Sequence, residues 1–151
     1  MDGAFEGDLI RPLGLVTLNF GYAEAEVDAL LAALNGLDPI GNAPRNATLG
    51  QKLAAVRELL NGLQIVEAGE LISIIDTASR LVERRNVLVH SCILARGRVV
   101  PSDKAKGELT VTPQQLGGLA EAIFTWKEEL SAARQLRLIP ALTRRHDNEG
   151  T

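Results

Sequence analysis

The feature that most constrains this chain is an apolar stripe at helical spacing between residues 67 and 91. Aliphatic side chains recur there every three or four residues, which is the period of an α-helix with one buried face. They are Leu71, Ile74, Ile75, Ala78, Leu81, Val82, Leu88 and Val89. Glu67 and Glu70 stand at the start, where carboxylates stabilise the positive N-terminal end of a helix. The stripe predicts a long helix from about Glu67 to Ser91.

Three more segments have apolar side chains at the same spacing, at about residues 12–35, 48–61 and 112–133. The second and third of them each begin with a capping box, Thr48–Gln51 and Thr112–Gln115. Aromatic residues make up only 3% of the chain, so aliphatic side chains must build the core. A core of this kind favours helices packed on helices.

The remaining segments complete the predicted fold. Residues 93–100 and 108–111 have the composition of short strands, and the polar residues 101–107 suit the turn between them. Residues 143–151 are polar, and we expect them to form a disordered tail. The predicted fold class is mainly α: a four- to five-helix up-and-down bundle, with a short β-hairpin before the last long helix. The chain length suits a single domain, which we expect over residues 1–142.

Charge is distributed unevenly along the chain. The net charge is -3, but residues 1–47 carry two basic and seven acidic side chains, whereas residues 83–106 carry six basic and two acidic ones. A basic patch on an acidic protein suits the binding of one phosphate chain at one place. Scattered, solvated charges would explain the same numbers equally well.

Several other classes of protein are not expected. No apolar run approaches the ~18 residues that a membrane-spanning helix needs. The N-terminal residues have neither the basic nor the apolar region of a signal peptide, so we expect a cytoplasmic protein without membrane association. Cys92 is the only cysteine, and no His, Cys and Asp residues cluster at metal-ligand spacing. Since there is no glycine-rich phosphate loop either, we expect no cofactor and no metal.

Two charged residues break the apolar stripes of the long helices. Arg85 falls in the middle of the stripe of residues 67–91, one heptad after Ala78, while Arg84 falls on the solvent side. Glu24 falls inside the stripe of residues 12–35. A charge on a core face is costly unless it is paired. We therefore predict an ion pair between Glu24 and Arg85, which could be functional or could only fix the register of the two helices.

A polar strip lies beside the stripe that contains Arg85. Asn86 and His90 are four residues apart, so they share one face of the helix, and Glu83 extends that face. A polar strip of this kind suits either a cleft or a partner helix. A histidine at a helix end is also explained as a C-terminal cap that the helix dipole favours.

Arg85, Asn86 and His90 spell R-N-x-x-x-H inside the run Leu-Val-Glu-Arg-Arg-Asn-Val-Leu-Val-His-Ser. This run resembles the R-x4–6-H signature of the HEPN family. HEPN domains are compact α-helical bundles of prokaryotic toxins, antiviral defence systems and some RNA-processing enzymes. The resemblance covers roughly residues 10–136. Arg84 also satisfies the signature, with five residues between it and His90.

The resemblance implies a chemistry as well as a fold. Many HEPN domains are metal-independent ribonucleases that pair as homodimers, so that two motifs face each other across one cleft. By this resemblance His90 of each chain would carry a proton, Arg85 would stabilise charge on the phosphoryl oxygens, and Asn86 would orient His90 or the phosphate. Glu24, Glu83 and Arg84 would support them. Other members keep the form of the motif and act as binding or dimerisation modules.

The sequence is compatible with three functions. The leading prediction is an RNA endonuclease of HEPN type, acting as a homodimer, such as the toxin of a toxin–antitoxin pair or a defence component. The alternative is a catalytically inactive HEPN module that binds a nucleotide or a partner protein, such as an antitoxin or a nucleotidyltransferase. The third is a structural helical domain with a buried Glu–Arg pair.

Overall fold

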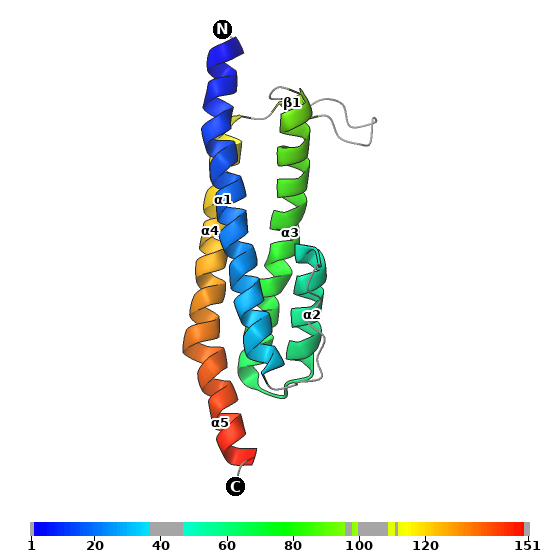
Figure 1. Ribbon diagram of the computed structural model, residues 1–151, viewed down its shortest axis with the longest axis vertical. Helices are drawn as coiled ribbons and strands as arrows, with labels where there is room; N and C mark the ends of the chain where they lie inside the picture. Colours follow the sequence, from blue (N-terminus) through cyan, green and yellow to red (C-terminus); the bar gives the residue numbers. More distant parts are fainter. Residues whose placement is uncertain (1, 37–46, 96–97, 100–108, 111, 150–151) are drawn as a thin grey trace. The chain divides into compact units, whose positions relative to one another are not determined.

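Helices account for most of the chain in the computed structural model (Figure 1). The residues that the structure describes are 2–36, 47–95, 98–99, 109–110 and 112–149, with side chains described for 9–36, 47–88 and 112–148. The helices are α1 (Asp2–Asn35), α2 (Leu49–Asn61), α3 (Val66–Ala95), α4 (Pro113–Ala133), the π-helical segment η2 (Arg134–Leu138) and α5 (Ile139–Glu149). The prediction of a mainly α helical bundle is confirmed. Within these residues, no helix is long and apolar enough to cross a membrane.

A short antiparallel pair follows α3. Strand β1 (Arg98–Val99) pairs with β2 (Leu109–Thr110), so that Arg98 stands opposite Thr110. The residues of the expected turn lie outside the described part of the chain, so the complete hairpin stays a prediction. Helix α3 continues to Ala95, and the strand expected from Ile93 is therefore wrong at its start.

The C-terminal end differs from the prediction of a disordered tail. Helix α5 runs to Glu149, so residues 143–149 are helical. Leu138, Ala141 and Leu142 are buried and hold the start of this helix against the core. Burial of these apolar groups supplies the stabilisation that a short polar helix lacks on its own.

Contacts along the chain define two compact units, where we expected one domain over residues 1–142. Unit 1 comprises Met1–Gly21 and Arg80–Thr125, and unit 2 comprises Tyr22–Ser79 and Trp126–Thr151. Helices α1, α3 and α4 contribute residues to both units. Each unit has its own buried side chains and is described separately below.

Unit 2 is built on fully buried leucines from α1, α2, α3, α4 and η2. They are Leu30, Leu60, Leu71, Leu130 and Leu138. Trp126 is buried beside them, and its Nε1 donates a hydrogen bond of 2.7 Å to the carbonyl oxygen of Ile74. This bond satisfies the polar end of a large buried ring, which favours one packing arrangement of α3 and α4 in this unit.

Unit 1 has a smaller core from α1 and α4. Its buried side chains include Val16, Phe20, Leu116, Leu119 and Ile123. Asn19 Nδ2 donates a hydrogen bond of 3.0 Å to the carbonyl oxygen of Ala120. The α3 stripe is less covered here, because Leu81, Val82 and Leu88 are only half-buried. Unit 1 therefore leaves apolar and charged groups of α3 accessible.

Candidate functional site

Arg85 lies on the core-facing side of α3, as the helical wheel predicted, but its partner is an aromatic ring. Its Cζ is 4.3 Å from the centroid of the Phe20 ring. The Nε atom is buried and has no hydrogen-bond partner, although the residue as a whole is partly exposed. A guanidinium over a ring face is stabilised by cation–π attraction. The positive charge of Arg85 is therefore held in place without being neutralised.

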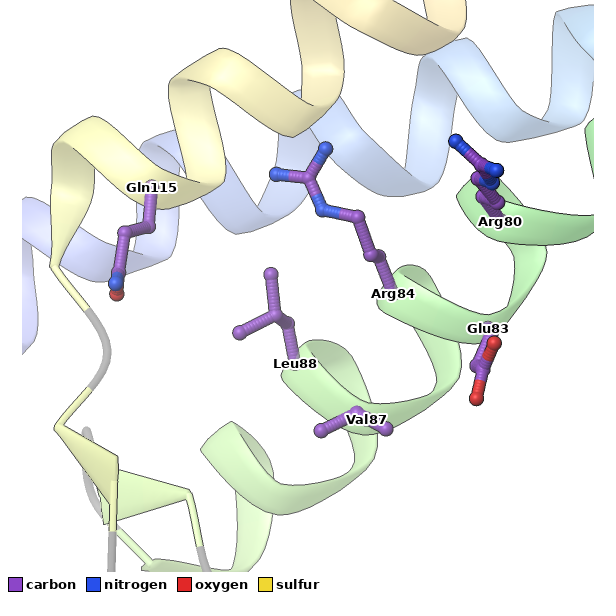
Figure 2. Close-up of a pocket in the computed structure, with 6 residues that line it drawn as sticks. All are labelled: Arg80, Glu83, Arg84, Val87, Leu88 and Gln115. Carbon is purple, nitrogen blue, oxygen red and sulfur yellow. The ribbon is translucent and has the colours of Figure 1, made fainter. Parts of the chain in front are cut away.

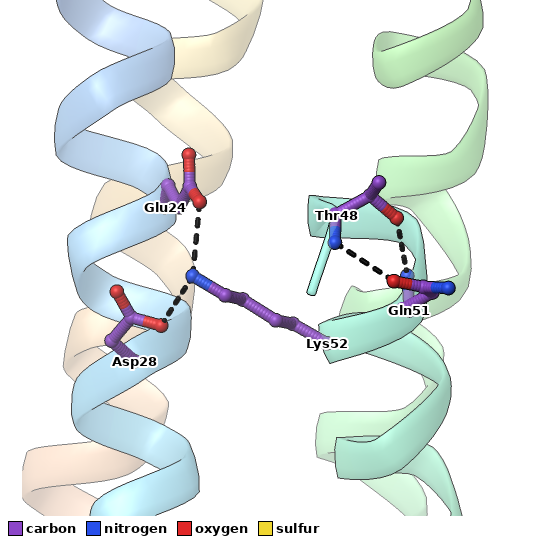
Figure 3. A network of polar contacts seen from close by, with 5 residues as sticks. All are labelled: Glu24, Asp28, Thr48, Gln51 and Lys52. Atoms are coloured by element: carbon purple, nitrogen blue, oxygen red, sulfur yellow. Dashed lines mark hydrogen bonds and ion pairs between the residues drawn. The ribbon is translucent and has the colours of Figure 1, made fainter. Parts of the chain in front are cut away.

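Glu24 has a partner within unit 2, while Arg85 belongs to unit 1, so the ion pair between them stays a prediction. Lys52 Nζ is 2.9 Å from Glu24 Oε1 and 2.9 Å from Asp28 Oδ1 (Figure 3). The Lys52 side chain is only 11% exposed, whereas that of Glu24 is 42% exposed. Hydrogen bonds from Lys52 to Asp28 and then to Glu24 raise the pKa of this lysine above its ordinary value. In this cluster the inward charge is Lys52, and the carboxylates of Glu24 and Asp28 are more exposed.

Lys52 could have been found from the sequence. It belongs to α2 and lies one turn before Val56, beside the apolar positions Leu49 and Leu53. The capping box fixes the start of this helix, because Gln51 N donates to Thr48 Oγ1 and Thr48 N donates to Gln51 Oε1 (Figure 3). A search for charges inside apolar stripes, when applied to α2, selects Lys52.

A more buried ion pair joins Glu26 and Arg134 within unit 2. Arg134 Nε is 2.6 Å from Glu26 Oε1, and the two side chains are 16% and 11% exposed. Glu26 stands two residues after Glu24, so at about 100° per residue it falls outside the apolar stripe of α1. Arg134 begins the π-helical segment η2, where the residue spacing departs from that of an α-helix. No periodicity argument on either helix could have paired these two residues.

The polar strip of α3 is accessible to solvent where its side chains are described. Glu83 and Asn86 are exposed, and Val87 beside them is 42% exposed. His90 belongs to α3 and stands four residues after Asn86, but its side chain lies outside the described part of the chain. The structure thus places Glu83, Arg84, Arg85 and Asn86 in one unit, and Glu24 in the other.

A pocket of about 520 Å³ adjoins this strip within unit 1 (Figure 2). It is lined by Arg80, Glu83, Arg84, Val87, Leu88 and Gln115. Arg84 and Leu88 reach from α3 toward α4, while Glu83 points away from Arg84 (Figure 2). The sequence placed Arg84 on the solvent side and gave no role to Arg80 or Gln115. Their grouping depends on the packing of α4 against α3, which a single-helix wheel does not contain.

The arginines of this α3 segment differ from those of unit 2. Among the described residues, the side chains of Arg80, Arg84 and Arg85 form no ion pair and no hydrogen bond. In unit 2, by contrast, four arginines each pair with a carboxylate: Arg57 with Asp76, Arg134 with Glu26, Arg137 with Glu70 and Arg144 with Glu67. Unpaired guanidinium groups concentrated at one place can bind an anion.

Comparison of the chain with models of protein families, with curated proteins and with solved structures finds no match in any of the three. Over the part of the chain that the structure describes, no group of three or more His, Cys, Asp or Glu side chains could hold a metal ion. The features of the chain that point to a function are therefore the arginines, the pocket and the motif.

Proposed function

We propose that this chain is a cytoplasmic, metal-independent RNA endonuclease of HEPN type, acting as a homodimer in a toxin or defence role. The observation that carries the proposal is that Arg80, Arg84 and Arg85 lack carboxylate partners within the described residues. Three guanidinium groups within six residues of one helix attract a chain of phosphates, even on a protein of net charge -3.

The proposed reaction is a transesterification within the RNA. The ribose 2′-oxygen attacks the adjacent phosphorus after a base removes its proton, and the bond to the 5′-oxygen breaks as an acid protonates that oxygen. The products are a 2′,3′-cyclic phosphate and a 5′-hydroxyl. Arg85 is the residue that would stabilise the charge on the phosphoryl oxygens, and Asn86 would orient His90 or the phosphate.

The proposed dimer follows from this need for one base and one acid. The motif of one chain contains a single histidine, His90, so two chains supply the two proton carriers. The exposed Val87 supports an interface at this place, because it puts an apolar group in the middle of the polar strip that contains Glu83 and Asn86. A second copy would bury it.

An inactive binding module is the second candidate, and the buried Nε of Arg85 favours it. That nitrogen cannot reach a ligand while it is covered, so one of the five N–H donors of the guanidinium is lost to the site. A module of this kind would use the same arginines to hold a nucleotide or an acidic segment of an antitoxin or a nucleotidyltransferase.

The test is cleavage of a panel of single-stranded RNAs in excess EDTA, with detection of the cyclic phosphate. We expect His90→Ala to lose roughly 10²–10⁴ of the rate, because it removes a proton carrier. DNA should stay intact, since it lacks the 2′-hydroxyl nucleophile. Equal cutting by the wild type and His90→Ala would assign the activity to a contaminant. No cutting of any RNA by the folded dimer would support the binding module.

A further inference from the structure

The pocket beside the motif is lined by aliphatic and cationic side chains, together with Glu83, which points away from Arg84 (Figure 2). Val87 and Leu88 give it aliphatic surface, and Arg80 and Arg84 stand one helical turn apart on α3 (Figure 2). Its volume of about 520 Å³ lies within the range of small-molecule sites. An inorganic anion would leave the aliphatic surface uncovered, and an apolar ligand would leave the arginines without partners. The lining suits a ligand with both a flat apolar part and a phosphate, as in a nucleotide.

Gln115 gives this pocket a hydrogen-bonding group of fixed direction. It closes the capping box of α4: its backbone N donates to Thr112 Oγ1 at 3.2 Å, and its side-chain Oε1 accepts from Thr112 N at 3.0 Å. One of the two acceptor positions of the amide oxygen is therefore already used. Its Nε2 forms no hydrogen bond within the described residues, so the side chain offers the pocket a donor.

We propose that this pocket reads one base of the RNA, and that Gln115 selects a base with a carbonyl rather than an amino group at pyrimidine position 4 or purine position 6. The base lies against Val87 and Leu88, its phosphate is held by Arg80 and Arg84, and the carbonyl accepts from Gln115 Nε2. Uracil and guanine have this carbonyl, whereas cytosine and adenine present an amino group, for which Gln115 Oε1 is the poorer partner because it already accepts from Thr112 N. The assignment of the nucleotide to a substrate chain rests on the proposed function, but nucleotide binding can be measured without cleavage.

The decisive variant is Gln115→Glu, because a carboxylate keeps the capping box and removes the donor. Titration calorimetry with uridine and cytidine 5′-monophosphates gives the ratio of their affinities. We expect the wild type to prefer the uridine nucleotide by roughly threefold to tenfold, the effect of about one hydrogen bond. Gln115→Glu should reverse the preference, since its carboxylate accepts from the cytosine amino group.

The chain offers a matched control in its other capping box. Gln51 makes the same pair of hydrogen bonds with Thr48 and does not line the pocket. Gln51→Glu should therefore leave the uridine-to-cytidine ratio unchanged. A ratio that is equal in the wild type and Gln115→Glu, with both proteins folded by circular dichroism, would overturn the role of Gln115.

The proposed contact between the phosphate and the arginines is tested with Arg84→Gln, and Arg11→Gln is the control. Arg11 is an exposed arginine of α1 in the same unit and does not line the pocket. Uridine monophosphate should bind Arg84→Gln roughly tenfold to a hundredfold more weakly and Arg11→Gln unchanged. Equal binding of the nucleotide by the wild type and Arg84→Gln would overturn the pocket. Binding of inorganic phosphate as tight as that of the nucleotide would overturn the base contact.

A short RNA shows whether the pocket takes a nucleotide of an RNA chain or a free nucleotide. Displacement of uridine monophosphate by a uridine trinucleotide supports a subsite for the RNA chain. Failure of the trinucleotide to compete would overturn the link to RNA and leave a site for a free nucleotide. Loss of nucleotide selectivity with RNA cleavage intact would reject only the pocket. Selective nucleotide binding without any cleavage would reject only the nuclease.

Discussion

Arg85 and Lys52 are both cations on apolar helix faces, and their surroundings differ. Two carboxylates neutralise Lys52, whereas Arg85 has the ring of Phe20 and a buried, unpaired Nε. A buried donor without a partner costs about 1–3 kcal/mol, and cation–π attraction at a partly buried site returns about 0.5–2 kcal/mol. The two terms nearly cancel, so Arg85 adds little to stability, and this supports a role for its charge in function.

Arg85→Met tests that inference at a single residue. Methionine keeps an unbranched apolar stem against Phe20 and removes the unpaired donor. We expect the free energy of unfolding to stay the same or rise by up to about 2 kcal/mol, while the rate of RNA cleavage falls roughly 10²-fold. Urea unfolding and the cyclic-phosphate assay measure the two quantities. A large loss of stability in Arg85→Met would instead assign Arg85 a structural role.

At the scale of elements, much of the fold could be predicted because its helices are amphipathic. The buried positions of α1, from Val16 to Leu34, are those that the apolar spacing selects, and both capping boxes form as expected. Periodicity gives the face of a helix and not the helix that covers it. The partners of Glu24 and Arg85, the pocket and the pair of Glu26 with Arg134 each depend on a second helix, so they could not be predicted.

Glu24 and Glu26 of α1 allow a matched test of how much each ion pair between helices stabilises the fold. Glu26 is 11% exposed in its pair with Arg134, and Glu24 is 42% exposed in its pair with Lys52. Glu26→Gln should destabilise the fold by about 3 kcal/mol, because it leaves a buried guanidinium uncompensated. Glu24→Gln should lower the free energy of unfolding by about 1 kcal/mol or less, because Lys52 keeps its ion pair with Asp28 and its contact with solvent. Urea unfolding measures the loss of stability in the two variants. Equal losses in the free energy of unfolding would contradict the assignment of Glu26 to the core.

At the scale of the whole molecule, the proposed cleavage needs two chains, because each motif supplies one histidine. We expect sedimentation at micromolar concentration to give a dimer, and Val87→Asp to give a monomer with reduced cleavage, because a charge would enter an apolar contact. Val66→Asp is the control: Val66 is 91% exposed and lies in unit 2. A wild-type monomer, or a Val87→Asp dimer, would contradict an interface on the α3 strip.

The salt dependence of RNA affinity tests most directly whether Arg80 and Arg84 of α3 bind RNA phosphates. Each phosphate contact with single-stranded RNA adds about 0.7 to the steepness of log K against log salt concentration. In a His90→Ala background that prevents cleavage, Arg80→Gln with Arg84→Gln should lower this steepness by about 1.4, whereas Arg11→Gln should leave it unchanged. An equal slope for the double variant and the parent would contradict the account.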